Sequence, residues 1–439
     1  MGARDIGEFR PLPLPRRLGR FLRVAWNFVV IYLGYKRIQR NRRLTPEERA
    51  ARYAQQHRRA AERMYRLAVS LEGLLIKTCQ FVSSRADVAP PEYIAVLSRL
   101  QDQVPPRPFE QVRTVIQEEL GADPHELFLS FEERPIASAS LAQVHRAVTR
   151  EGERVAVKVQ YPGIARVVAT DLQNLRLLVR ILARLEPNFD FRVVLDEMAR
   201  YVPRELDFVE EGKSAERIAE IHAHRTDIRV PKVHWDLTSR RVITLEYIDG
   251  IKISDTAALH AAGIDPNAVA LIMTEAYCEQ ILVHGFFHAD PHPGNLLVQP
   301  GPVVVFLDFG MTKQLPDEFR RNYARLTIAI LQQDEAAMVE AFRALGFETK
   351  YDDPATLVAL GRSFFEVTGP DGRPYVDADV MPEVNERLSR ILHENPVTRI
   401  PGDVVLIFRV LGLMSGLQKR LDSRVSMTET ITPFALREA

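Results

Sequence analysis

The segment from Gly285 to Gly310, "GFFHADPHPGNLLVQPGPVVVFLDFG", limits the fold of this chain more than any other. Four residues separate Asp290 from Asn295, and an apolar run ends in Asp308-Phe-Gly. Kinase catalytic loops have this spacing, and an Asp-Phe-Gly that follows a strand binds metal in that fold. Mg²⁺ prefers such hard oxygen ligands and keeps phosphates in its shell. The pattern predicts a phosphoryl-transfer centre in which Asn295 and Asp308 hold magnesium, while Asp290 is the base or orients the nucleophile.

Three histidines in the same region raise a rival interpretation. His284, His288 and His292 recur at intervals of four, a spacing that binds metal when it lies on a helix. Pro291 and Pro293 make a helix through this stretch implausible. We therefore expect His288 to brace the loop by hydrogen bonding rather than to bind a transition metal.

Strand-like segments upstream resemble the nucleotide-binding part of a kinase. "ERVAVKVQ" alternates Val with other residues and contains one lysine, Lys158, which is predicted to pair with the α- and β-phosphates. A lone strand lysine more often faces solvent, so the small-residue loop before it matters to the interpretation. The loop residues predicted to contact the nucleotide are Ala137, Ser138, Ala139 and Ser140.

Two further stretches complete the predicted nucleotide site. The acidic run "RELDFVEEG" opens a helix, which by itself indicates only compensation of the helix dipole. A kinase-like site needs one helix carboxylate to hold the strand lysine, and Glu211 is the candidate partner of Lys158. "VPKVHWDLTSRRVITLEYIDG" predicts a hairpin whose second strand ends at Glu246 and Tyr247, where a hinge would bind adenine. A helix expected from about Pro316 leaves no room for a long activation segment.

The N-terminal third is predicted to be helical. Residues 1–18 are expected to be irregular, and a helix capped by Thr45 should run to about Val69. The segment from 71 to 109 predicts two helices separated by "APP". Lys77 and Gln80 share a face of the first, where they could simply cover a buried helix with their stems.

Charge is distributed unevenly along the chain. Residues 1–60 hold fifteen basic and four acidic residues, a net charge of +11 in a protein whose total formal charge is zero. The apolar stretch from Phe21 to Tyr35 contains Arg23 and is too short to span a bilayer. Trp26 and the flanking arginines suit a helix lying on anionic lipid, whereas a helix packed on the protein's own body is the alternative. Only two cysteines occur, so a reducing compartment is expected.

With these motifs, roughly residues 65–420 resemble the UbiB/AarF family of atypical kinase-like proteins, which support ubiquinone and related prenyl-lipid metabolism. The matching segments are "KTCQ", "PIASASLAQVHRA", "VAVKVQYPG", Glu205-Leu206-Asp207 and the magnesium motif. The resemblance implies that Lys77 and Gln80 lie over the active site, and that Glu205 and Asp207 anchor their helix. We therefore expect Lys77 to act at the site rather than merely to cover a buried helix with its stem.

The chain departs from the family pattern in two places. Cys79 stands where the family has Gly, and we expect this change to be tolerated because Cys is small. Ser138 and Ala142 alter the alanine-rich loop. Alanines restrict the approach of backbone N–H groups that glycines would permit, so ATP placement should differ from that in protein kinases.

The expected fold is α+β and bilobal, protein-kinase-like, with a small mixed sheet in the N-lobe, a helical C-lobe and an added N-terminal helical extension. The expected parts are a basic arm or interfacial helix at 1–44, the extension at 45–125, the N-lobe at 126–247 and the C-lobe at 248–439.

The expected activity is Mg²⁺-dependent binding and hydrolysis of ATP, or phosphoryl transfer, with ATP or ADP and Mg²⁺ as cofactors. A non-catalytic, nucleotide-gated lipid-binding scaffold is the alternative, and a conventional protein kinase is a third. Expected partners are nucleotide and an anionic membrane lipid or prenyl-lipid intermediate. No nucleic acid is expected, and a homodimer is left open. The expected location is the cytoplasm, peripheral on the inner face of the cell membrane.

Overall fold

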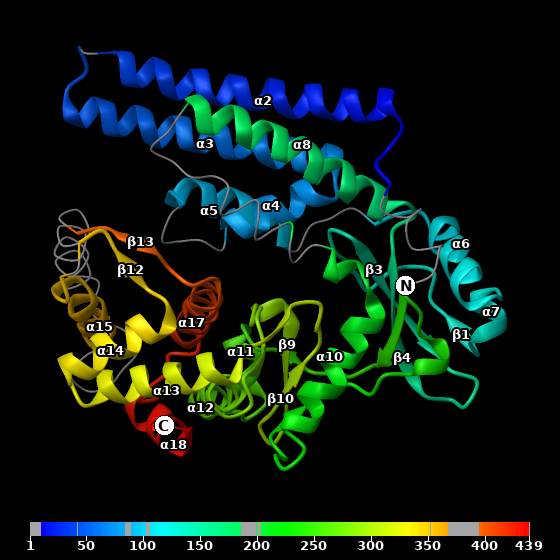
Figure 1. Cartoon of the computed structure of the whole chain (residues 1–439). Coiled ribbons are helices and arrows are strands. Elements are labelled where there is room, and N and C mark those ends of the chain that lie inside the picture. Colours follow the sequence, from blue (N-terminus) through cyan, green and yellow to red (C-terminus); the bar gives the residue numbers. More distant parts are fainter. Residues whose placement is uncertain are drawn as a thin grey trace. The chain divides into compact units, whose positions relative to one another are not determined.

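The chain combines α-helices with several small sheets, the mixed α+β class that was predicted (Figure 1). The computed structural model describes residues 10–41, 43–83, 89–101, 106–185, 199, 203–351, 353–367 and 395–438. Two compact units are present. The first unit comprises Met1–Gly212 and Lys232–Tyr247, and the second comprises Lys213–Pro231 and Ile248–Ala439.

A group of helices opens the first unit: α2 (Leu14–Arg40), α3 (Pro46–Leu71), α4 (Leu74–Ser83), α5 (Pro91–Leu97), η1 (Ser98–Gln101) and α8 (Ile164–Leu185). Thr45 caps α3 as predicted, and the cap is reciprocal. Its hydroxyl accepts from the Glu48 N–H, and the Glu48 carboxylate accepts from the Thr45 N–H. Among the described residues, no helix combines the length and apolarity needed to cross a membrane.

The predicted irregular start of the chain is wrong after residue 13. Helix α2 begins at Leu14, with Pro13 at its N-cap and a proline in its first turn. The first turn tolerates proline because its missing N–H would have had no helical partner there. The prolines of "PLPLPRR" therefore start this helix, although the sequence analysis took them as a sign of irregular chain.

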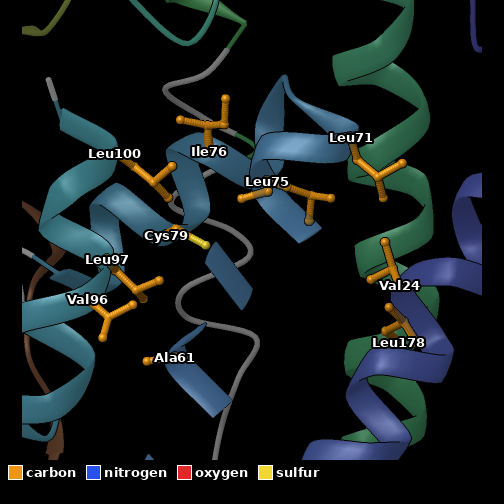
Figure 2. Close-up of a cluster of buried hydrophobic side chains, with 11 residues drawn as sticks. Val24, Ala61, Leu71, Leu75, Ile76, Cys79, Val96, Leu97, Leu100 and Leu178 are labelled. Atoms are coloured by element: carbon orange, nitrogen blue, oxygen red, sulfur yellow. The ribbon is translucent and has the colours of Figure 1, made fainter. Parts of the chain in front are cut away.

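Helices α2, α3, α4, α5 and α8 share one apolar core (Figure 2). Val24 of α2 and Leu178 of α8 meet residues of α3 and α4 there. Cys79 lies in this core and is 3% exposed. Burial raises the pKa of its thiol to about 12, so the side chain stays protonated and packs like a small apolar residue.

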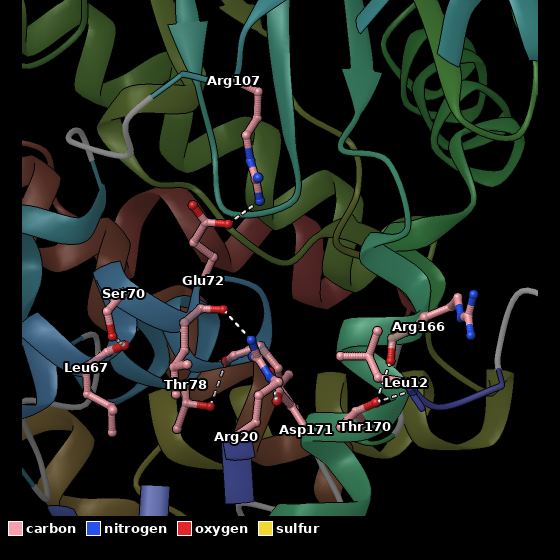
Figure 3. A network of polar contacts seen from close by, with 12 residues as sticks. Leu12, Arg20, Leu67, Ser70, Glu72, Thr78, Arg107, Arg166, Thr170 and Asp171 are labelled. Carbon is pink, nitrogen blue, oxygen red and sulfur yellow. Dashed lines mark hydrogen bonds and ion pairs between the residues drawn. The ribbon is translucent and has the colours of Figure 1, made fainter. Parts of the chain in front are cut away.

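A buried ion pair fixes α2 to α8 (Figure 3). The Arg20 guanidinium donates to both Asp171 carboxylate oxygens, at 2.9 and 2.6 Å, and its third contact is the Leu71 carbonyl at 2.7 Å. The N–H of Leu12 donates to the Thr170 hydroxyl at 2.8 Å. Burial raises the pKa of Asp171, and Arg20 opposes that rise. These contacts set which face of α2 turns inward.

The sheet of the first unit is antiparallel, with strand order β1-β3-β4-β6 and β2 paired to β3. Its strands are β1 (Ser130–Phe131), β2 (Ala137–Ser138), β3 (Ala142–Val148), β4 (Arg154–Gln160) and β6 (Val242–Glu246). Val155, Val157 and Val159 of β4 are fully buried in a core with α6 (Phe109–Leu120). This alternation directs Lys158 to the opposite face of the strand.

The hairpin predicted before Glu246 is only partly present. Its second strand is β6, but the first arm is reduced to a single bridge between Val233 and Leu245. The turn η3 (Trp235–Leu237) follows this bridge directly. The remaining elements of the first unit are α7 (Pro124–Leu127) and η2 (Arg204–Leu206), and the boundary between the two units divides α10 (Phe208–Ile221) after Gly212.

The second unit contains two small sheets near the predicted magnesium motif. One has the order β5-β10-β9-β7, and the other pairs β8 with β11. The strands are β5 (Ile228–Arg229), β7 (Ile251–Lys252), β8 (Phe286–His288), β9 (Leu296–Gln299), β10 (Val303–Phe306) and β11 (Thr312–Gln314).

Helices form most of the rest of the second unit. They are α11 (Thr256–Ala261), α12 (Pro266–Cys278), the π-helical turn η4 (Glu279–Val283), the 3-10 turn η5 (Pro293–Asn295), α13 (Asp317–Leu331), α14 (Glu335–Leu345), α15 (Ala355–Val367), α17 (Gly402–Arg420) and α18 (Met427–Glu438). A short pair, β12 (Glu348–Thr349) and β13 (Val397–Arg399), accompanies them. Met338, Phe342 and Val404 belong to the core of α13, α14, α15 and α17.

Candidate nucleotide and magnesium site

The first unit holds Lys158 against a helix carboxylate. Its Nζ lies 2.7 Å from Oε1 and 3.0 Å from Oε2 of Glu211, so the contact is bidentate. The side chain of Glu211 is 2% exposed and that of Lys158 is 16% exposed. Nζ also lies 5.2 Å from the ring centroid of Phe208, one turn earlier on α10. The two residues expected to pair are therefore in contact, in a setting that excludes most water.

A second lysine of the first unit reaches the segment that leads into α10. Lys77 on α4 lies 2.6 Å from Glu205 Oε2, in the turn η2. Gln80, one turn further along α4, donates to the Leu100 carbonyl at 2.9 Å. Asp207 accepts from the Val209 N–H at 3.1 Å at the start of α10. The "KTCQ" helix is thus tied to the segment that ends at Glu211, and its role over a nucleotide stays a prediction.

The alanine-rich loop is held by its own backbone. Ala137 and Ser138 pair with β3, and the N–H of Ala139 donates to the Ala142 carbonyl at 2.8 Å. The Tyr161 hydroxyl donates to the Ala139 carbonyl at 3.1 Å. Ser140 is buried, whereas Ala137 and Ala139 are exposed. Because the Ala139 N–H is engaged within the loop, it is not presented to phosphate in this conformation.

Backbone donors at the predicted hinge are also engaged. The N–H of Glu246 donates to the Lys232 carbonyl at 2.8 Å, and that of Tyr247 donates to the Arg154 carbonyl at 2.9 Å. Arg146 donates to the Tyr247 hydroxyl at 2.7 Å and lies over its ring. Contact between these two residues and adenine would therefore have to use groups other than their N–H donors.

In the second unit, two strand pairs bring the magnesium motif together. Leu296 of β9 pairs with Phe306 of β10, and the Leu307 N–H donates to the Asn295 carbonyl at 3.0 Å. Asn295 and Asp308 therefore lie at the same end of the β9–β10 hairpin. The predicted metal ligands are neighbours across strands although they are thirteen residues apart in the sequence.

The loop that carries Asp290 is closed on its other side by β8 and β11. His288 pairs with Thr312, and the N–H of Ala289 donates to the Met311 carbonyl at 2.8 Å. His288 braces the loop as predicted: its Nε2 contacts the Asp308 carbonyl, and its Nδ1 faces the Asp290 N–H at 3.4 Å. The ring is buried, which lowers the pKa of His288. His292 instead accepts from the Gly294 N–H.

Sequence reasoning missed the partner of Asp290. Arg409 of α17 donates from Nη2 to Asp290 Oδ1 at 2.9 Å, and its Nη1 lies 3.2 Å from the Met311 sulfur. The side chain of Arg409 is 12% exposed. One signal for it was present, because this arginine interrupts the apolar run "VVLIFRVLGLM" in the same way that Lys158 interrupts its strand.

A buried glutamine was also missed. The π-helical turn η4 places Gln280 so that its Nε2 contacts His222 Nε2 at 3.0 Å and its Oε1 accepts from the His288 N–H at 2.9 Å. His222 Nδ1 lies 3.2 Å from Glu279 Oε2, which is within ion-pair range although the geometry is not that of a hydrogen bond. Gln280 therefore connects His222, the residue after α10, to the strand that carries His288. Single-turn π-helices often mark functional segments.

His222 gives the second unit a dependence on pH. Burial, with the nearby charges of Arg225, His224 and His284, lowers the pKa of His222 to about 3. The unfolded chain binds a proton near the ordinary value of 6.5, whereas the folded chain does not. Stability is therefore fully present above that value and is lost as the pH falls from it toward 3.

We expect the melting temperature to fall between about pH 7 and pH 5, and His222→Gln to reduce that slope because glutamine does not titrate. His260→Gln, at an exposed histidine of α11, is the matched control and should leave the slope unchanged. Thermal melts of the three proteins across this range measure the effect. An unchanged slope in His222→Gln would contradict the assignment.

The residues of the magnesium motif fit a cation held mainly by phosphate oxygens. The Asn295 side-chain nitrogen donates to the Asp290 carbonyl at 3.3 Å, which leaves the carboxamide oxygen as its possible metal ligand. Asp308 adds carboxylate oxygens, one of which accepts from the Gly310 N–H at 3.0 Å. Within the described part of the chain, no cluster of three or more His, Cys, Asp or Glu residues could hold a metal. An open site of two side chains is the arrangement that Mg²⁺ with a nucleotide uses.

The strand lysine held by a helix glutamate and the paired Asp-Asn and Asp-Phe-Gly loops define a protein of the kinase-like class. Comparisons with known proteins agree with this class. The model of the ABC1 atypical kinase-like domain matches residues 99–342. The chain therefore belongs to the ABC1 family of atypical kinase-like proteins, which is the UbiB/AarF family of the sequence resemblance.

Relatives share this assignment over most of their length. AarF domain-containing protein kinase 1 of Mus musculus is 34% identical over 387 residues, which cover 87% of this chain and 74% of the relative. AarF domain-containing kinase 1 of Drosophila melanogaster is 33% identical over 425 residues, 94% of this chain and 82% of the relative. The complex of Rv3197 with erythromycin from Mycobacterium tuberculosis is a structural neighbour with a TM-score of 0.61 and 23% identity, covering 80% of this chain and 89% of that one. This likeness shows the fold alone.

Proposed function

We propose that the chain is a Mg²⁺-dependent ATPase or phosphotransferase that supports ubiquinone or related prenyl-lipid metabolism at a membrane. The observation that carries the proposal is the buried bidentate pair of Lys158 and Glu211. Two opposite charges with so little exposure lose hydration on folding, and buried charge pairs of this kind are common at functional sites. In this proposal Lys158 binds the nucleotide phosphates and Glu211 orients it.

In the proposed mechanism, the second unit supplies the groups that act at the transferred phosphate. Asn295 and Asp308 would hold Mg²⁺, which when bound neutralises phosphate charge that develops during transfer. Asp290 takes the proton of the attacking hydroxyl or water, or orients that nucleophile. Arg409 keeps the carboxylate of Asp290 in one position.

Peptide phosphorylation receives little support. Strand β11 begins two residues after Gly310, and α13 begins at Asp317. This short connection leaves no activation segment on which a peptide could dock, and Lys77 is engaged with Glu205. The favoured acceptor is therefore water or a small lipid-like molecule. The proposed location is the cytoplasm, with peripheral attachment to the inner face of the cell membrane.

The second candidate is a nucleotide-gated scaffold without turnover. The observation that favours it is the cationic helix α2, which contains no acidic residue and could bind lipid without any chemical step. A scaffold of this kind would bind nucleotide, and change its lipid binding in response, without releasing phosphate.

Turnover of ATP by the purified chain distinguishes the two candidates. Phosphate release is expected with Mg²⁺, and removal of Mg²⁺ with EDTA should reduce it to background. Nucleotide binding should be measured in parallel by the change in melting temperature on adding ATP and Mg²⁺. Binding without phosphate release, with and without anionic vesicles, would reject the ATPase and favour the scaffold.

A further inference from the structure

Helix α2 carries a continuous apolar stripe on its outer face. Leu14, Leu18, Leu22, Trp26, Val29 and Leu33 are between 46% and 74% exposed. Their spacing of three or four residues aligns them along one face of the helix. A contiguous exposed apolar stripe is uncommon on the surface of a protein that stays in water. Such a surface indicates a binding partner.

The inner face of α2 is already occupied, so the stripe cannot turn inward without breaking contacts. Val24 is buried in the core of Figure 2, and Arg20 binds Asp171 (Figure 3). Arg20 also donates to the Leu71 carbonyl. The Tyr35 hydroxyl contacts His57 Nδ1 at 2.7 Å. The sequence left two alternatives, a helix on lipid and a helix packed on the protein's own body. The inner face of α2 is packed on the protein, and the outer face is exposed and could contact lipid.

Charge on α2 indicates the chemistry of the partner. The helix contains six arginines and one lysine and no acidic residue. Arg23, Arg37 and Arg40 are exposed like the stripe. An apolar face with arginines at its edges, and a tryptophan in its middle, is the composition of helices that lie in the interface of an anionic membrane. From Leu14 to Leu33 the stripe offers a contact about 29 Å long.

We infer that α2 is the membrane-docking surface of this protein and binds anionic phospholipid bilayers through its apolar stripe and flanking arginines. A second copy of the chain is disfavoured as the occupant because it would bring an equally cationic, acid-free helix to the same face. Nucleic acid would engage the arginines but would leave the apolar stripe in water. The inference deepens the membrane role within the proposed function by naming the surface responsible.

Flotation of the full chain with vesicles tests this surface without nucleotide, so loss of ATP turnover would not affect the result. The protein should float with vesicles of phosphatidylcholine and phosphatidylglycerol, and not with phosphatidylcholine alone. Leu22→Glu/Trp26→Glu should weaken partitioning by roughly tenfold for each side chain removed from the bilayer. Leu129→Glu, at a residue 62% exposed elsewhere in the first unit, is the matched control and should float normally. Thermal melts verify that each variant is folded.

Tryptophan fluorescence gives an independent measurement, because the chain has only Trp26 and Trp235. In Trp235→Phe, emission from Trp26 should shift to shorter wavelength on anionic vesicles. In Trp26→Phe, the emission of Trp235 should not change. No flotation of the wild type, normal flotation of the double glutamate variant, or no shift from Trp26 would each overturn the inference. So would dimerisation or binding to an acidic protein through the stripe with no vesicle binding.

Discussion

Asp308→Asn is expected to lower Mg²⁺-dependent ATP turnover by about a thousandfold, corresponding to roughly 4 kcal/mol of transition-state stabilisation. The substitution preserves the shape of the side chain. It also keeps an oxygen that can accept the hydrogen bond from the Gly310 N–H, which is 3.0 Å long in the wild type. It removes the negative charge that a magnesium ligand supplies beside phosphate. Melting temperature without nucleotide should change little, so the loss is assigned to the site rather than to folding.

Asp317→Asn is the matched control for this experiment. Asp317 is exposed in the first turn of α13, in the same unit, and has no assigned role at the magnesium motif. The control should retain wild-type turnover. The rise in melting temperature on adding ATP and Mg²⁺ should shrink in Asp308→Asn and persist in Asp317→Asn. Unchanged turnover in Asp308→Asn would reject the assignment of the motif.

Glu211→Gln is expected to lower turnover by about a hundredfold and to destabilise the protein by about 3 kcal/mol. Glutamine can still accept a hydrogen bond from Lys158, but it leaves the ammonium, at 16% side-chain exposure, without its counter-charge. Lys158 would then lose both its orientation and a partner that compensates its desolvation. Steady-state turnover and denaturant unfolding measure the two effects.

The neighbouring residue provides the control, and a double variant separates the causes. Glu210→Gln changes an exposed glutamate of the same helix turn and should leave both quantities nearly unchanged. Lys158→Met/Glu211→Leu replaces the pair with apolar side chains and should recover much of the stability but none of the turnover. A double variant as unstable as Glu211→Gln would contradict the explanation by an unpaired buried charge.

Local patterns predicted the elements that depend on local chemistry. The Thr45 cap, the alternation of β4 and the position of Lys158 follow from residues that are near in sequence. Leu14–Leu18 was assigned wrongly because proline at a helix start resembles proline in an irregular arm. Whether such a segment becomes helical depends on whether the inner face of α2 can pack into a core. That core is made by residues far along the chain, so a short window of sequence does not show it.

Long-range contacts account for what was missed at the site. Arg409 lies 119 residues after Asp290, and no period or motif connects them. Gln280 and His222 are 58 residues apart in the sequence. They meet because the π-helical turn after α12 alters the direction in which the side chain of Gln280 points. The Tyr247 N–H at the predicted hinge is engaged by the carbonyl of Arg154, which is distant in sequence.

The pairing of β8 with β11 has a consequence for control of this protein. His288, Phe287 and Phe286 pair in register with Thr312, Lys313 and Gln314, and Ala289 is bonded to Met311 just beyond them. The Thr312 hydroxyl also lies 2.9 Å from that of Ser214. In many protein kinases the segment after Asp-Phe-Gly orders and disorders to switch activity. Here the residues that follow Gly310 are built into a sheet, so an order–disorder switch at this place would have to break the pairing of β8 with β11.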